Sequence, residues 1–322
     1  MKKITVIGGG TGTFVVLSGL KNLNLDLAVI VSMTDSGGST GKLRDQLGVL
    51  PPGDLRQCLV ALSDAPILWR KLFLYRFETG DFQGHNFGNI FLAALEKVSE
   101  NYDQVMELAS YILQTKGKVI PVTYDKLHLV AEYENGKVIT GEGLIDENFS
   151  ETSRIKKVYL TPHGKANQKA IDRIIESDYL VIGPGDLYTS IIPVFLVDGI
   201  REALKKTKAK IIYIMNLMTK VGQTNGFTAK NHLDELEKYL SQKVDTVILN
   251  NAPIAQEIID YYHQHKEEKV VDDLDSEKYQ IVRADLIDNK PVSVNKVDTV
   301  YRSILRHDSQ KVASLLNKIF ND

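Results

Sequence analysis

The sequence predicts an α/β fold, with a mostly parallel sheet, helices on both faces and an inserted antiparallel hairpin. The first observation is a series of short apolar, β-branched runs without strict alternation, which is typical of strands buried on both faces. The second is that segments of helical periodicity separate these runs. The third is a single alternating stretch around Asn135 and Gly136, a dipeptide that strongly favours a hairpin turn.

The predicted elements follow from these runs in chain order. Strands are expected at residues 4–7, 27–31, 179–182, 211–215 and 244–249. Helices are expected from near Phe14, beyond Cys58, and at 90–98 and 233–240, where apolar residues recur three and four apart. The hairpin joins 127–133 to 137–140 and belongs to an insertion at about 122–160. Because no linker rich in Pro, Gly or Ser interrupts the chain, we expect one domain over 1–322.

Composition excludes several classes of protein. Lys plus Arg total 39 against 41 for Asp plus Glu, a net charge of -2, so no overall charge favours nucleic acid or anionic lipid. The single cysteine, Cys58, excludes an intramolecular disulfide and a multi-cysteine zinc site, and it fits a reducing compartment. The apolar runs are far shorter than the roughly 18 residues of a membrane span, and no signal peptide opens the chain. We therefore expect a cytoplasmic protein.

The first predicted strand ends in the glycine-rich loop GGGTGT at 8–13. Glycines let phosphate oxygens reach the amide donors at a helix N-terminus, where the helix dipole favours negative charge. The dinucleotide fingerprint is matched in part, since Thr13 replaces its third glycine, and a glycine-rich turn without a ligand is the alternative. The predicted phosphate contacts are Gly9, Gly10, Thr11, Gly12 and Thr13.

A loop of small and hydroxyl residues, DSGGSTGK at 35–42, follows the second predicted strand. Ser36 and Leu43 stand where a P-loop requires glycine and a hydroxyl, so Walker-type hydrolysis of ATP or GTP is not expected. Loops at the carboxyl ends of neighbouring parallel strands meet at one edge, and we expect this loop and the first to form one crevice. The predicted contacts are Asp35, Ser36, Gly37, Gly38, Ser39 and Thr40.

Asp54 lies in a third motif, PPGDLRQ at 51–57. Asp35 and Asp54 together could hold Mg²⁺ against phosphates, although Asp54 could instead cap a helix. Arg56 offers a fork for phosphate or carboxylate, or a surface ion pair. Asp35 and Asp54 are the candidate catalytic residues. A serine nucleophile is not expected, because Ser36, Ser39 and Ser190 have no adjacent base and no nucleophile-elbow motif.

Further candidate binding residues stand at the start of a predicted helix or directly after predicted strands. Asn86 and Asn89 suit a base edge or sugar hydroxyls, or they cap a helix. His85 beside them is a candidate general base. Gly183 and Gly185 follow one strand and Asn216 follows another, so all three are expected at the crevice.

These motifs together resemble the YvcK-like family of gluconeogenesis factors (UPF0052), of the CofD-like superfamily. The resemblance rests on VIGGGTG at 6–12, MTDSGGSTG at 33–41, LPPGDLR at 50–56, GHNFGN at 84–89 and IGPG at 182–185, and it spans nearly the whole chain. It implies a Rossmann-like fold, a cytoplasmic location, UDP-sugar binding, and a role in cell shape and wall synthesis during gluconeogenic growth. Enzymes of the wider superfamily are magnesium-dependent phospholactate transferases. Ser36 stands where those enzymes carry a second aspartate, so the resemblance does not imply that their chemistry is kept.

Three functional hypotheses remain open. The leading one is a non-catalytic regulator that binds a nucleotide sugar such as UDP-N-acetylglucosamine, with Asn86, Asn89 and Asn216 orienting the base or sugar. The second is a magnesium-dependent transferase that binds GDP, with Asp35 and Asp54 as metal ligands. The third is an NAD-dependent oxidoreductase in which Asp35 binds a ribose. Expected partners are a protein of wall synthesis or metabolism and a second copy of the chain, but not nucleic acid.

Overall fold

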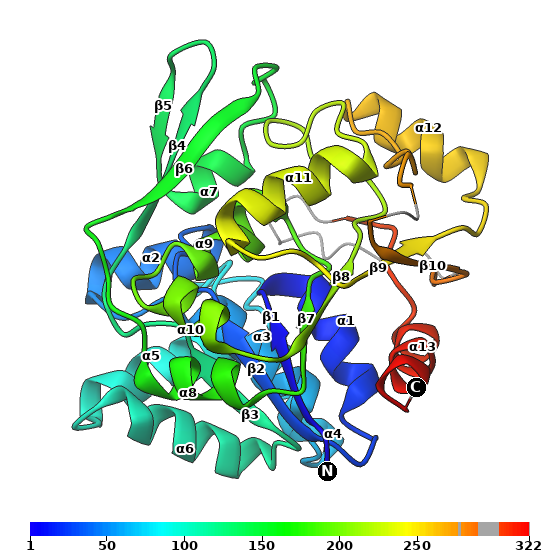
Figure 1. Ribbon diagram of the computed structural model, residues 1–322. Helices are drawn as coiled ribbons and strands as arrows, with labels where there is room; N and C mark the ends of the chain where they lie inside the picture. Colours follow the sequence, from blue (N-terminus) through cyan, green and yellow to red (C-terminus); the bar gives the residue numbers. More distant parts are fainter. Residues whose placement is uncertain (276–277, 289–302, 322) are drawn as a thin grey trace.

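The computed structural model describes residues 1–275, 278–288 and 303–321, and within them a seven-stranded sheet forms the centre of the fold (Figure 1). Its strand order is β10-β9-β8-β7-β1-β2-β3, and every pair of neighbours is parallel. The α/β fold class with a mostly parallel sheet is therefore confirmed. The strands are β1 (Lys3–Ile7), β2 (Asp26–Val31), β3 (Lys118–Pro121), β7 (Tyr179–Ile182), β8 (Lys210–Ile214), β9 (Thr246–Asn250) and β10 (Gln280–Ala284).

The five predicted strands all lie in this sheet, whereas its two edge strands were not predicted. β3 has four residues and ends at Pro121, and β10 has no fully buried position. An edge strand needs neither a long apolar run nor burial on both faces, so neither strand carries the pattern of a central strand.

Strand order reverses between β1 and β7, because the chain moves from β1 to β2 and β3 on one side and from β7 to β8, β9 and β10 on the other. Such a reversal is the topological switch point of an open α/β sheet, and a ligand crevice forms outside the carboxyl ends of its strands. The loops after Ile7 and Ile182 lie at this point.

Helices cover both faces of the sheet, as predicted. α1 packs against α3 and α13 on one face, whereas α8 and α10 pack together on the other (Figure 1). A single turn of π-helix, Leu187–Ile191, leads into α9. The helices are α1 (Gly10–Leu20), α2 (Gly38–Leu47), α3 (Pro52–Leu62), α4 (Ile67–Leu74), α5 (Phe87–Val98), α6 (Tyr102–Leu113), α7 (Glu142–Asp146), α8 (Gln168–Glu176), α9 (Ile192–Phe195), α10 (Ile200–Lys206), α11 (Ala229–Leu240), α12 (Gln256–Gln264) and α13 (Ser309–Asn321). None of the helices among the described residues has the length and apolarity to cross a membrane.

All four predicted helices begin earlier than the sequence indicated, and at α1 and α3 the difference changes the reading of a motif. α1 begins at Gly10 rather than near Phe14, so the glycine loop itself forms the first turn. α3 begins at Pro52, with Pro51 as its N-cap, and Asp54 is therefore not a cap but lies in the first turn. Proline is favoured at the first helical position because its missing N–H has no partner there in any case.

The predicted hairpin is part of a separate three-stranded antiparallel sheet with the order β5-β4-β6. β4 (His128–Tyr133) pairs with β5 (Val138–Thr140) around the turn at Asn135 and Gly136, and β6 (Ile155–Thr161) pairs along the other edge of β4. α7 lies between β5 and β6 in the chain. The insertion at the expected position is confirmed, and it contains one strand and one helix more than a hairpin.

Arg173 on α8 connects β1 and β2 by bonding to residues of both strands. Its side chain is 6% exposed and forms an ion pair with Asp26 at 2.9 Å. The guanidinium also donates to the Thr5 hydroxyl at 2.9 Å and to the Ile4 carbonyl at 3.1 Å. A buried charge is tolerated when its donors are satisfied in this way, so Arg173 fixes α8 against the central strands.

Candidate functional site

A cavity of about 230 Å³ opens at the switch point, at the carboxyl ends of β1 and β7. Most of the residues predicted to bind a ligand line it, although they come from segments far apart in the sequence. They are Gly9, Gly10, Thr11, Gly12, Asp35, Gly37, Gly38, Ser39, Thr40, Asp54, Arg56, Asn89, Gly185 and Asn216. The expected crevice between the first two loops therefore exists as a geometric feature.

The glycine loop forms one wall of the cavity. Gly9 is the N-cap of α1 and supplies no side-chain hydrogen bond, and the first residues of the helix, Gly10, Thr11 and Gly12, line the cavity. The amide of Gly10 donates to Asp54 Oδ1 at 2.9 Å. Gly12 lies so close to the loop after β7 that a Cβ there would stand 2.2 Å from the Pro184 carbonyl oxygen. Only glycine allows this approach, which gives the wall the form of a phosphate-binding helix N-terminus.

Asn216 holds the loop after β7 in place. Its Nδ2 donates to the Gly185 carbonyl at 2.9 Å, and its Oδ1 accepts from the Gly185 amide at 3.4 Å. Asn216 therefore supports the cavity wall through the backbone.

Four predicted contacts do not line the cavity. Thr13 is fully buried within α1, and Gly183 turns the chain after β7 with a φ of 71°. Asn86 caps α5 by accepting from the Asn89 amide at 3.3 Å, which confirms the capping alternative for Asn86. Ser36 accepts a hydrogen bond from the Gly143 amide at 2.9 Å. These residues shape or support the site from behind.

Asn89 lies inside α5 and faces the second loop. Its Nδ2 donates to the hydroxyl oxygens of Ser39 and Thr40 at 3.4 Å each. Asn89 is 3% exposed, and its Oδ1 has no hydrogen-bond partner among the residues that the structure describes. His85 does not line the cavity but contacts Ser39 Oγ through Nδ1 at 3.3 Å. Burial, with Lys42 and Arg76, lowers the pKa of His85, so His85 is neutral at pH 7.

The inserted α7 closes one side of the cavity. The Ser36 amide donates to Glu142 Oε2 at 3.1 Å, and the Gly143 amide donates back to Ser36 Oγ. A Cβ on Gly143 would stand 3.0 Å from the Gly37 Cα, so the two loops touch at backbone level. Ser36, found where an aspartate was expected, therefore fastens α7 to the second loop.

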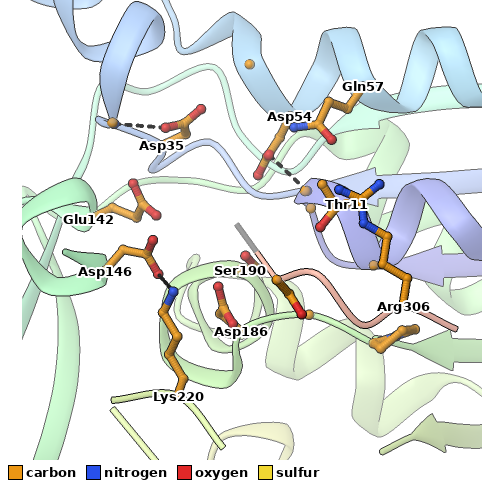
Figure 2. A pocket seen from close by; sticks show the side chains of 18 of the residues that line it. Thr11, Asp35, Asp54, Gln57, Glu142, Asp146, Asp186, Ser190, Lys220 and Arg306 are labelled. Atoms are coloured by element: carbon orange, nitrogen blue, oxygen red, sulfur yellow. Dashed lines mark hydrogen bonds and ion pairs between the residues drawn. The ribbon is translucent and has the colours of Figure 1, made fainter. Parts of the chain in front are cut away.

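Acidic side chains gather on the α7 side. Figure 2 shows Asp35, Glu142 and Asp146 on one side of the cavity, across from Thr11 and Arg306. Burial and the neighbouring Asp35 and Asp146 raise the pKa of Glu142 well above its usual value. We call Asp35, Glu142 and Asp146 the acidic wall.

Lys220, from the loop after β8, balances part of this charge. Its Nζ lies 3.5 Å from Asp146 Oδ1, and both side chains are largely buried. Burial lowers the pKa of Lys220, but Asp186, Asp146 and Glu267 outweigh burial and raise it above its ordinary value. Burial, opposed by Lys220, raises the pKa of Asp186 to about 6.

The sequence analysis missed the cavity residues that come from the insertion and from the C-terminal half. Asp186 directly follows the IGPG motif, and that position is a signal that could have found it. The others follow no glycine loop, and only the folded chain brings them to the switch point. They include Glu142, Gly143, Asp146, Lys220, Tyr262, Glu267, Leu305, Arg306 and His307, and Arg76, which follows α4, was missed as well.

Asp35 and Asp54 were the predicted magnesium ligands, and both line the cavity. Each accepts a backbone N–H with Oδ1, from Gly37 at 3.0 Å and from Gly10 at 2.9 Å. The described residues contain no group of three or more His, Cys, Asp or Glu arranged to hold a metal ion. Magnesium is commonly bound by one or two carboxylates together with phosphate oxygens. The two aspartates therefore fit Mg²⁺ in the company of a ligand's phosphates, whose charge it would screen.

Comparison with known proteins gives consistent matches over the whole chain. The family model described as 2-phospho-L-lactate transferase CofD matches residues 4–287. A protein of Thermotoga maritima is 39% identical over 319 residues, covering 98% of this chain and 99% of that protein. The gluconeogenesis factor of Bacillus subtilis is 40% identical over 317 residues, covering 98% and 96%. The crystal structure of a UPF0052 family member from Bacillus halodurans superposes with a TM-score of 0.88 at 35% identity, covering 98% and 99%.

Proposed function

This chain belongs to the CofD family and is a relative of the gluconeogenesis factors, and we propose that it is a regulatory protein that binds a nucleoside diphosphate sugar. The observation that carries the proposal is the two-sided cavity at the switch point. One side presents helix amides and an arginine, and the other presents hydrogen-bond acceptors.

The diphosphate belongs on the side of the glycine loop. The first turn of α1, whose N-cap Gly9 makes no side-chain hydrogen bond, offers the amides of Thr11 and Gly12 and a favourable dipole there, beside the Gly10 amide that already donates to Asp54. The Arg306 guanidinium extends toward this loop at Thr11, and Ser190 lies nearby (Figure 2). Arginine and amide donors together can hold a diphosphate without a basic surface, in agreement with a net charge of -2.

The sugar belongs on the side of the acidic wall. Carboxylates accept hydrogen bonds from hydroxyls, whereas a phosphate beside them is repelled. Asn89 adds an amide oxygen that has no partner within the protein. The far end of the ligand is therefore a neutral group rich in hydroxyls, for which UDP-N-acetylglucosamine is the representative we propose.

The biological role we propose follows the relatives and the resemblance of the motifs. The protein would act in the cytoplasm, where a lone buried thiol such as Cys58 stays reduced. It would couple the level of a nucleotide sugar to cell shape and wall synthesis during gluconeogenic growth, through a protein partner in wall synthesis or metabolism or through self-association.

Calorimetric titration of the whole protein tests this function. UDP-N-acetylglucosamine, GDP and NAD are each titrated with EDTA and again with Mg²⁺. Micromolar binding of the UDP-sugar in EDTA supports the proposal. Failure of all three ligands to bind under either condition contradicts it.

A magnesium-dependent transferase is the second candidate, because the matching family model is that of a transferase. Asp54 approaches the amides that would meet a phosphate, and a cation held by Asp35 and Asp54 would remove the resulting repulsion. GDP binding that requires Mg²⁺ and is lost in Asp54→Ala would favour this candidate. An NAD-dependent oxidoreductase is disfavoured, since no relative named above is one.

A further inference from the structure

The outer side of α4 is apolar although it faces solvent. Six of the eight residues of this helix, ILWRKLFL, are apolar, so α4 is apolar on more than one side. Its inner side is buried, because the Phe73 ring packs against the Phe91 ring of α5 at a centroid distance of 5.1 Å. Ile67, Leu68 and Leu74 lie on the opposite side and are exposed, Leu68 by 74%. A helix that is apolar all round is normally covered on all sides, and within the part of the chain that the structure describes nothing covers this side of α4.

Helix α6 extends the apolar side of α4. Leu108 and Tyr111 lie three residues apart on α6 and are exposed, Tyr111 by 80%. Trp69 of α4 lines the same groove as Tyr111. The Ala65 amide donates to the Leu113 carbonyl at 3.2 Å, so the chain that enters α4 lies against the end of α6. We define the α4–α6 face by its six exposed apolar residues, which are Ile67, Leu68, Trp69, Leu74, Leu108 and Tyr111.

The α4–α6 face is larger than the apolar patches of ordinary monomers. If a large side chain has a full area of about 200 Å², the exposed fractions of the six residues amount to roughly 700 Å². Tyr75 and Phe82 are also exposed, and contacts with the Phe77 ring at 5.1 and 5.4 Å join them in a row at the end of α4. They bring the total to roughly 900 Å². The largest patch of a typical monomer is about 300–600 Å², whereas each subunit of a standard interface buries about 800 Å², so the area suffices for a stable dimer.

The charges on this surface favour a second copy of the chain as its partner. Lys71 is exposed on the outer side of α4, and Glu107 is exposed where α6 lines the groove. Glu78 and Asp81 are exposed in the segment that follows α4, and these acidic groups would be repelled by an anionic lipid surface. A surface with one charge of each sign can be complementary to itself, because a two-fold axis brings the same surface of two copies together and can place Lys71 of each copy against Glu107 of the other.

We propose that the α4–α6 face is the interface of a two-fold symmetric dimer of this chain. Leu68 and Tyr111 are buried within this interface, and Lys71 of each copy pairs with Glu107 of the other. None of the residues of the face lines the cavity, so the dimer does not depend on which ligand the cavity binds.

Size-exclusion chromatography with light scattering, at about 20 µM protein, tests the dimer. Wild type should have the mass of two chains. Leu68→Glu/Tyr111→Glu should have the mass of one chain, because each copy would bury two carboxylates in the interface and weaken association at least about 100-fold. The matched control is Val271→Glu, which places a carboxylate at a 60% exposed apolar residue outside the face and should remain dimeric. A monomeric wild type, including one that binds anionic vesicles instead, overturns the proposal, and so does a double variant that remains dimeric.

Charge reversal excludes misfolding as the reason for a lost dimer. Lys71→Glu and Glu107→Lys should each associate about 10- to 100-fold more weakly than wild type, because each variant sets like charges against each other. An equimolar mixture of the two should form heterodimers, because both ion pairs are restored with reversed signs, and misfolded chains could not regain assembly on mixing. Single variants that associate as tightly as wild type, or a mixture that associates no better than its components, would overturn the pairing of Lys71 with Glu107. A protein that dimerises but binds no nucleotide contradicts the proposed function alone, whereas a monomer that binds the nucleotide contradicts the dimer alone.

Discussion

Replacing Gly12 with alanine tests whether ligand binding requires the close contact between the glycine loop and the loop after β7. A Cβ on Gly12 would lie 2.2 Å from the Pro184 carbonyl oxygen, 2.6 Å from its carbonyl carbon and 3.2 Å from the Gly185 amide nitrogen. These are backbone atoms, so no side-chain rotation can relieve the contact. The two loops must separate by about 1 Å to reach ordinary van der Waals distance.

The expected effects on stability and binding differ in size. Overpacking costs about 1–3 kcal/mol, and the better helix propensity of alanine returns up to about 1 kcal/mol, so the net loss of unfolding free energy is about 0–3 kcal/mol. The loss of binding free energy is larger, because two loops that have moved apart cannot both donate hydrogen bonds to one diphosphate. Loss of one amide bond to a charged group is worth about 1.5–3 kcal/mol, or roughly a 10- to 100-fold weaker affinity.

Gly19→Ala is the matched control. Gly19 lies in the same helix, and its added Cβ would stand 2.1 Å from the Ser309 carbonyl oxygen at α13, away from the cavity. Calorimetry with UDP-N-acetylglucosamine and urea denaturation are carried out on both variants. We expect both to lose stability and only Gly12→Ala to lose affinity. If Gly12→Ala binds as wild type does, or if the two variants lose affinity equally, the reasoning is refuted.

Three further predictions concern stability. Arg173→Met should lower the unfolding free energy by about 2–4 kcal/mol in urea denaturation, because the bonds to Thr5 and Asp26 are lost; a change below about 1 kcal/mol would show that the network contributes little. Burial lowers the pKa of His232 to about 4, so the unfolded chain takes up a proton below pH 6.5 and the folded protein does not. The unfolding free energy should therefore fall between pH 6.5 and pH 4, and His232 should account for roughly 3 kcal/mol of this loss. Denaturation is measured over this pH range for wild type and His232→Leu, and a variant that loses stability as steeply as wild type would disprove the prediction. Ser36→Ala removes the acceptor of the Gly143 amide, and hydrogen exchange at residues 142–146 should become faster, whereas unchanged protection would mean that other contacts hold α7.

The central sheet could be predicted from the sequence because its strands are buried on both faces. β1 and β7 are apolar along almost their whole length, and the loops that follow them carry glycine for close backbone approach. The edge strands β3 and β10 carry a weaker signal, since β3 has only Val119 and Ile120 before a proline and β10 has no buried position.

The candidate site was predictable where a residue directly follows a strand. Asn216 and the predicted contacts of the first two loops, apart from Thr13 and Ser36, line the cavity. Glu142 was missed because its place in the cavity depends on how the insertion docks on the sheet. Lys220 was missed because it lies well inside the long loop after β8 rather than directly after the strand. Ser36 illustrates the same limit, since its partner Gly143 is 107 residues away in the chain.

A crystal structure of the protein with UDP-N-acetylglucosamine, grown in EDTA, tests the central claim most directly. The account predicts the diphosphate within hydrogen-bond distance of the amides of Thr11 and Gly12, and the sugar hydroxyls against Glu142 and Asn89. A diphosphate bound away from the glycine loop, or a sugar turned away from the acidic wall, would contradict it.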